Sequence, residues 1–90
     1  MMMSISIRAL IISQLEQTAK EHSQTLAPLT DDLRLLNSGL DSLAFAVVTA
    51  RLEDQLQVDP FSSGEFPVTL GELVRAYERA AVQRAASTSP

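Results

Sequence analysis

No cysteine occurs in this chain, so a domain of only 90 residues must be held together without disulfides or thiolate-bound metals. A domain of this size buries roughly 60% of the surface that its unfolded chain exposes, so its core is small. The single histidine, His22, leaves no set of imidazole ligands for a metal site. A short helical bundle with mostly local contacts is the architecture that most easily becomes stable under these limits.

The pattern of apolar residues predicts two helices in the first part of the chain. The first is expected over about residues 4–22, and the second over residues 42–56 with Asp41 as its N-cap. The pair Asp59-Pro60 is expected to end the second helix, because proline disfavours helical geometry in the residue before it. The apolar face of the first helix consists of Ile7, Leu10, Ile11, Leu15 and Ala19. The inward stripe of the second consists of Phe45, Val48, Thr49, Leu52 and Leu56.

A third helix is expected to begin at Thr69, which forms a capping box with Glu72. Its apolar stripe consists of Leu70, Leu73, Val74 and Tyr77, extended by Ala80 and Ala81. Residues 23–39 form a long loop with one short helical turn near residues 33–36, and a second short turn is expected over residues 61–65. The leucines expected to pin the loop to the bundle are Leu26, Leu29, Leu33, Leu35 and Leu36. The sequence therefore predicts an all-α bundle of three main helices plus one short helix, with a long loop between the first two main helices.

The segment Gly39-Leu40-Asp41-Ser42-Leu43 stands directly before the second helix. A serine at this place exposes its hydroxyl, and the helix N-terminus favours any negative charge attached there. Gly39 is expected to supply a turn conformation that other residues avoid. A serine at a helix start is also common as a simple capping residue, so Ser42 alone would decide little.

These five residues match the modification motif of the acyl and peptidyl carrier proteins, and the expected helices follow the order and spacing of that family over roughly residues 5–80. The resemblance implies an acyl-carrier-protein-like domain over residues 1–85, followed by a disordered tail over residues 86–90. It implies a covalent 4′-phosphopantetheine arm on Ser42, with Asp41 and Leu43 contributing to the attachment site. The arm would hold cargo as a thioester, and the chain itself would not be an enzyme.

The resemblance also implies three partners: a phosphopantetheinyl transferase, a ligase that loads the arm, and a downstream acceptor enzyme. The second helix is apolar nearly all round, which indicates either complete burial or a docking surface. Docking would then use the residues next to Ser42, with Arg51 and Asp54 setting charge and register. The expected contact residues are Leu40, Leu43, Ala46, Val47, Ala50 and Arg51.

The class of cargo is indicated by a difference between the second helix of this chain and that of the fatty-acid carriers. Those proteins have acidic residues along the exposed face of this helix, where Ala44 and Val47 stand here. An aminoacyl or specialised acyl cargo fits this difference better, with a fatty-acyl carrier as the alternative. The few large side chains predict no deep cargo pocket, so the cargo is expected to stay outside the bundle.

Two other classes of protein, a hydrolase and an unmodified adaptor, are alternatives to a carrier. A hydrolase needs a base and an oxyanion hole beside its serine, and His22 is far from Ser42 in sequence. An unmodified adaptor that docks through the second helix remains an alternative, although it leaves the Gly39–Leu43 segment as a coincidence. An unmodified adaptor would keep its function as Ser42→Ala, whereas a carrier would lose it.

Charge and hydropathy narrow the partners and the location. The whole chain has a net charge of −4, and its acidic side chains gather in residues 31–65, which hold seven acidic and two basic residues. This distribution argues against nucleic-acid binding and favours partners with basic surfaces. The apolar run at residues 9–12 is too short for a signal-peptide core or a membrane span. We expect a free-standing, cytoplasmic, monomeric protein that does not bind membranes.

Overall fold

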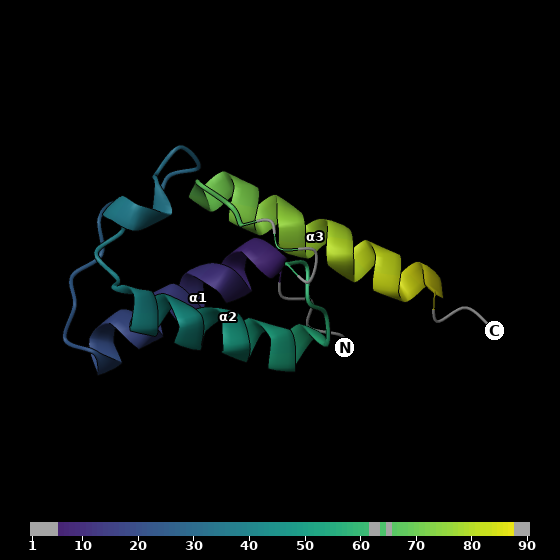
Figure 1. The fold of residues 1–90 in the computed structure, drawn as a ribbon, viewed down its shortest axis with the longest axis horizontal. Helices are drawn as coiled ribbons and strands as arrows, with labels where there is room; N and C mark the ends of the chain where they lie inside the picture. The colour runs from purple at the N-terminus through teal and green to yellow at the C-terminus, as the bar shows by residue number, and fades with distance from the viewer. Residues whose placement is uncertain (1–5, 62–63, 65, 88–90) are drawn as a thin grey trace.

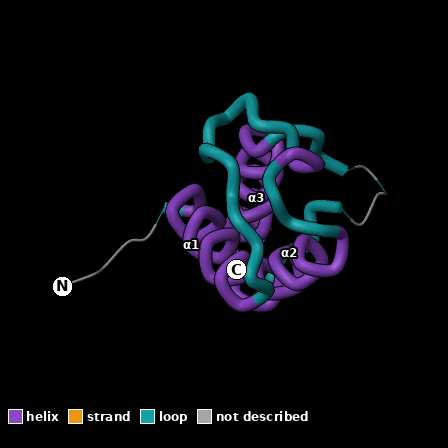
Figure 2. Tube along the Cα trace, turned by 90° about the vertical axis from the view of Figure 1, so that its left-hand side faces the viewer, coloured by secondary structure: helices purple, strands orange, loops and turns teal. Residues whose placement is uncertain are grey.

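The computed structural model describes residues 6–61, 64 and 66–87, and it forms an all-helical bundle over these residues (Figure 1). The elements are α1 (Ile7–Glu21), the short 3₁₀ helix η1 (Leu35–Asn37), α2 (Ser42–Leu56) and α3 (Leu70–Ser87). Helix α1 packs against both α2 and α3. Figure 2 views the bundle nearly end-on, and there the long α1–α2 loop passes across the end that faces the reader. The predicted fold class is therefore confirmed.

The core is formed by one face of each helix, together with two leucines of the α1–α2 loop. Its buried apolar residues are Ile11, Leu15, Ala19, Leu35, Leu40, Ala44, Val48, Leu52, Leu70, Leu73, Val74 and Tyr77. The four residues of the predicted α3 stripe are all among them. Helix α1 also buries two polar residues, Gln14 and Thr18, which the apolar pattern does not predict.

Helix α1 begins later than predicted, at Ile7, because the Ser6 hydroxyl accepts the N–H of Ala9 (3.0 Å) and so caps the helix. The expected start at residues 4 and 5 lies outside the described residues. Helix α2 begins as predicted, with Asp41 as N-cap. It also ends at Leu56 as predicted, but the residue that stops it is Gln57, which adopts a left-handed conformation with φ 58°, and not the pair Asp59-Pro60.

The α1–α2 loop is joined to the start of α3 by backbone hydrogen bonds. The N–H of Leu35 donates to the carbonyl of Val68 (2.9 Å), and the N–H of Leu70 donates to that of Leu33 (2.9 Å). The N–H of Gly71 also donates to the carbonyl of Asp31 (2.9 Å). We call these three hydrogen bonds, which join residues 31–35 to residues 68–71, the seam. The seam fixes the loop on the bundle, although the loop contains no strand among the described residues.

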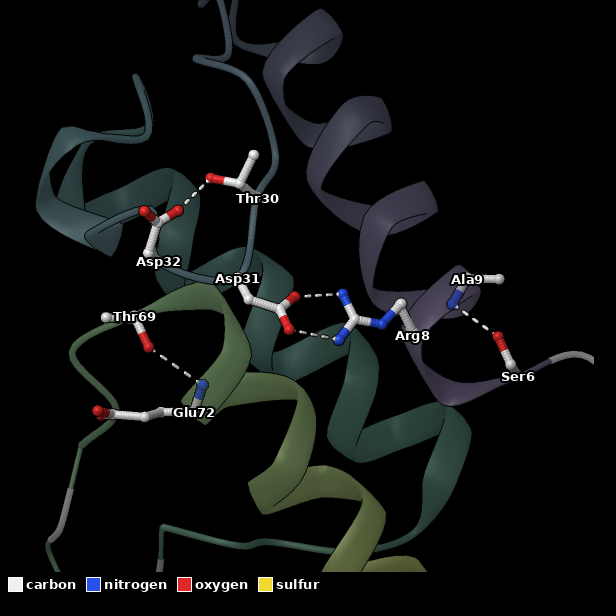
Figure 3. Close-up of polar contacts among 8 residues, drawn as sticks. All are labelled: Ser6, Arg8, Ala9, Thr30, Asp31, Asp32, Thr69 and Glu72. Carbon is white, nitrogen blue, oxygen red and sulfur yellow. Dashed lines mark hydrogen bonds and ion pairs between the residues drawn. The ribbon is translucent and has the colours of Figure 1, made fainter.

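Side chains on either side of this seam add polar contacts, which Figure 3 shows. The Arg8 guanidinium forms a two-pronged ion pair with the Asp31 carboxylate, at 2.6 and 3.1 Å. The Thr69 hydroxyl accepts the N–H of Glu72 (3.2 Å), as expected for a capping box. The Glu72 carboxylate accepts the N–H of Val68 (2.9 Å), so the return bond lies one residue before the N-cap.

Two other expectations about irregular segments need correction. Leu36 does not pin the loop: its side chain is 96% exposed, because η1 turns it away from the core. The tail does not begin at residue 86, since α3 continues to Ser87 and residues 88–90 lie outside the described part. The short turn expected over residues 61–65 also lies partly outside it. Among the described residues, none of the helices has the length and apolarity to cross a membrane.

Candidate functional site

Ser42 is the first residue of α2, and its side chain is exposed. Within the described residues its hydroxyl has no hydrogen-bond partner, and neither have the N–H groups of Ser42 and Leu43. The next two N–H groups are taken, because those of Ala44 and Phe45 donate to Asp41 (2.8 and 2.9 Å). The first turn of α2 thus presents a free hydroxyl beside two free donors, which suits a phosphate ester at that position.

Asp41 is held by hydrogen bonds on both sides of its carboxylate. One oxygen accepts the N–H of Ala44 and the other accepts the side-chain amide of Gln24 (2.9 Å). These two bonds lower the pKa of the Asp41 carboxyl below its usual value, and the charge of His22 acts in the same direction. The capping role predicted for Asp41 is confirmed. The contact between Gln24 and Asp41 could not be predicted from the sequence pattern.

The lowered pKa gives a pH dependence that an Asp41→Asn variant isolates, because asparagine keeps the shape and the capping ability. A carboxyl whose pKa is lower in the folded state stabilises the fold fully above its unfolded pKa of about 3.9. We therefore expect the parent to exceed the variant in free energy of unfolding at neutral pH. This excess should vanish as the pH falls through the folded-state pKa of Asp41. Urea unfolding of both proteins from neutral to acid pH measures it, and a pH-independent difference would contradict the assignment.

The turn before Ser42 requires a glycine for two separate reasons. Gly39 has φ 102°, a conformation that residues with side chains rarely adopt. A Cβ placed there would also lie 1.9 Å from the backbone carbonyl oxygen of Thr25. The adjacent Ser38 is buried, and its carbonyl accepts the N–H of Ala27 (2.9 Å). The predicted role of Gly39 is therefore confirmed, and the segment around residues 25–27 packs directly against the turn.

The residues expected to contact partners fall into two groups. Leu43 is 67% exposed, Ala46 and Ala50 are exposed, and Val47 is half-buried, so all four are accessible on one side of α2. Leu40 is only 8% exposed and belongs to the core, so the structure corrects its assignment to the docking surface.

The role of Arg51 in setting charge for a partner stays a prediction, and the structure shows that Arg51 also makes contacts within the chain. Its guanidinium forms an ion pair with Glu21 (2.9 Å) and donates to the hydroxyl of Thr18 (3.2 Å). Both contacts are with α1, so Arg51 ties α2 to α1. These contacts also give the buried Thr18 hydroxyl its partner.

Ala44 does not lie where an acidic docking residue would lie. Its side chain is fully buried against the core, so an acid there would be buried as well. The packing of this chain therefore accounts for the absence of an acid at Ala44, and Val47 is the accessible position where the acid expected in fatty-acid carriers is missing.

Ser42 lies on the rim of two hollows that the sequence did not reveal. One, of about 650 Å³, is lined mainly by apolar residues of the loop, of η1 and of the segment before α3. The other, of about 340 Å³, lies along α2 toward Glu53 and Asp59. Phe45 and Phe66 line both. Phe45 comes from α2, whereas the exposed Leu36 and Phe66 come from η1 and from the segment before α3, where no long periodicity tells which side chains face outward.

The fold and the site together define a small helical domain that presents one free hydroxyl at a helix start, which is the layout of a carrier domain. Residues 6–76 match the family described as "Phosphopantetheine attachment site", and the chain belongs to this family. Its members are the sites of covalent 4′-phosphopantetheine attachment, and they carry acyl groups as thioesters without being enzymes themselves. A phosphopantetheinyl transferase and acyl-handling enzymes are therefore their partners.

Two much longer proteins match part of this chain. The chain is 38% identical over 61 residues to the "Non-reducing polyketide synthase CTB1" of Cercospora beticola. It is equally similar to the protein of that name from Cercospora nicotianae. Each match covers 68% of this chain, which spans only 3% of the length of those relatives. No solved structure matches the chain.

Proposed function

We propose that Ser42 is the attachment residue and that the chain carries a specialised acyl group on a 4′-phosphopantetheine arm. The observation that carries the proposal is the free hydroxyl of Ser42 beside the free N–H groups of Ser42 and Leu43. These donors suit the phosphate of the arm, and the family match includes the whole segment. When bound, the arm supplies the thiol that holds the cargo.

For the cargo, a specialised acyl group of the polyketide kind is favoured over an aminoacyl group. Both relatives named above are polyketide synthases, and the buried Ala44 removes one reason to prefer an aminoacyl carrier. The ligase that loads the arm and the acceptor enzyme would then handle acyl groups. We place their docking surface on Leu43, Ala46, Val47 and Ala50, which lie beside or shortly after Ser42 on α2.

Intact-mass spectrometry tests the function on the unaltered chain. The protein is incubated with coenzyme A, Mg²⁺ and a broad-specificity phosphopantetheinyl transferase, and the product is digested to map the modified peptide. We expect a gain of one phosphopantetheine on the peptide that contains Ser42. The holo protein is then offered to an acyltransferase with malonyl-coenzyme A and, separately, to an amino acid ligase with ATP. Uptake of amino acids alone would contradict the acyl cargo, and no gain in a folded sample would favour the adaptor.

A further inference from the structure

Helix α1 ends in a backbone arrangement that fixes the position of Gln24. The N–H of Ser23 donates to the carbonyl of Lys20 (3.2 Å), and the N–H of Gln24 donates to that of Ala19 (2.8 Å). Ser23 adopts a left-handed conformation with φ 56°. These are the hydrogen bonds of a Schellman motif, so the chain leaves α1 in one defined direction.

The side chain of Gln24 then makes two hydrogen bonds to a single residue, the N-cap of α2. Its amide nitrogen donates to the Asp41 carboxylate (2.9 Å), and its amide oxygen accepts the backbone N–H of Asp41 (3.3 Å). Only this orientation of the amide satisfies both groups, since the carboxylate accepts and the N–H donates. Gln24 therefore fixes both the main chain and the side chain of Asp41.

This double contact bears on Ser42 because Asp41 precedes it directly. The second carboxylate oxygen of Asp41 accepts the N–H of Ala44, and its carbonyl accepts that of Phe45. An exposed aspartate without a further partner exchanges between capping and solvent-facing rotamers. The Gln24 amide favours the capping rotamer, which keeps the first turn of α2 closed and the Ser42 hydroxyl in one place.

We propose that Gln24 is a positioning residue for the Ser42 site: it acts through Asp41 to hold the start of α2 ready for the transferase. The inference rests on the proposed attachment at Ser42. It assigns a role to the junction between the end of α1 and the start of α2, which neither the family match nor the relatives' names describe.

The first test compares kcat/KM of a phosphopantetheinyl transferase for the parent, Gln24→Ala and Gln55→Ala. Gln55 is an exposed glutamine of α2 and serves as the matched control. We expect Gln24→Ala to lower kcat/KM by about threefold to tenfold, the range that one net hydrogen bond spans, and Gln55→Ala to leave it unchanged. In an Asp41→Ala background the Gln24→Ala change should have no further effect, because its partner is gone. Additive losses in the double variant would overturn the inference.

A second test needs no transferase and separates this role from the attachment itself. The carboxyl carbon of Asp41 is followed by NMR as the pH is lowered, in the unmodified parent and in Gln24→Ala. Loss of the amide donor should raise the pKa of Asp41 toward its usual value, whereas Gln55→Ala should not. An unchanged titration would overturn the inference even if the parent is modified normally. Failure of the parent to be modified would instead overturn the proposed function and leave the Gln24–Asp41 contact established.

Discussion

A Ser42→Ala variant should take up no 4′-phosphopantetheine under conditions in which the parent is modified completely. The replacement removes the hydroxyl that would form the phosphate ester, and α2 offers no other hydroxyl in its first turn. The fold should survive, because the Ser42 side chain is exposed and alanine is a good helix former. We expect a change in the free energy of unfolding of less than about 0.5 kcal/mol. Intact mass and urea unfolding measure the two quantities on the same sample.

Ser13→Ala provides the matched control, since Ser13 is an exposed serine on α1. This variant should be modified at the rate of the parent. Uptake of the arm by Ser42→Ala would place the attachment on another residue. Loss of uptake together with loss of helical structure would show a folding defect, and Ser42→Thr would then be needed to test the hydroxyl within an intact fold.

Replacing Gly39 with alanine should produce the largest loss of stability of any single change at the site. The backbone there has φ 102°, and a residue held in such a region costs about 1–3 kcal/mol. The added Cβ would also lie 1.9 Å from the Thr25 carbonyl oxygen, a backbone atom that cannot rotate away. A chain of this size has only about 5–13 kcal/mol of stability, so the turn and the segment beneath it should separate or the domain should unfold.

Gly64→Ala separates the two causes. Gly64 also has a positive φ, of 91°, but a Cβ there meets nothing within 4 Å. The excess loss in Gly39→Ala over Gly64→Ala, measured by urea unfolding, therefore reports the contact with Thr25. Equal losses would mean that the backbone conformation alone matters and that the 25–27 segment does not brace the turn.

The parts of the fold that depend on local signals were predictable from the sequence. Helix α2 has the predicted bounds, because Asp41 is a strong N-cap and the apolar pattern after it is clear. The start of α3 is likewise predicted by a capping residue, because the Thr69 hydroxyl just before the helix accepts the N–H of Glu72. The turn at Gly39 is predictable because a glycine before a helix often supplies a backbone conformation that other residues avoid, and its φ of 102° agrees.

The parts that depend on how elements meet were not predictable. Ala44 is small and apolar in any arrangement, so only the packing of α2 shows that it is buried. Arg51 is a typical surface residue in the sequence, yet its partners Glu21 and Thr18 lie on another helix. Gln24 belongs to a loop without periodicity, and its amide becomes significant only because the end of α1 faces Asp41.

The seam between the α1–α2 loop and α3 has a consequence for how far the attachment point can travel. The loop is fastened near one end by Gln24 and further along by the hydrogen bonds of Leu33 and Leu35, so only short spans of it remain unsupported. A short loop segment that is held at both ends has little conformational freedom, so it cannot move far from the bundle. In the proposed function Ser42 therefore keeps a fixed position relative to the bundle. The distance to successive enzymes must then be covered by the flexible arm or by movement of the whole domain.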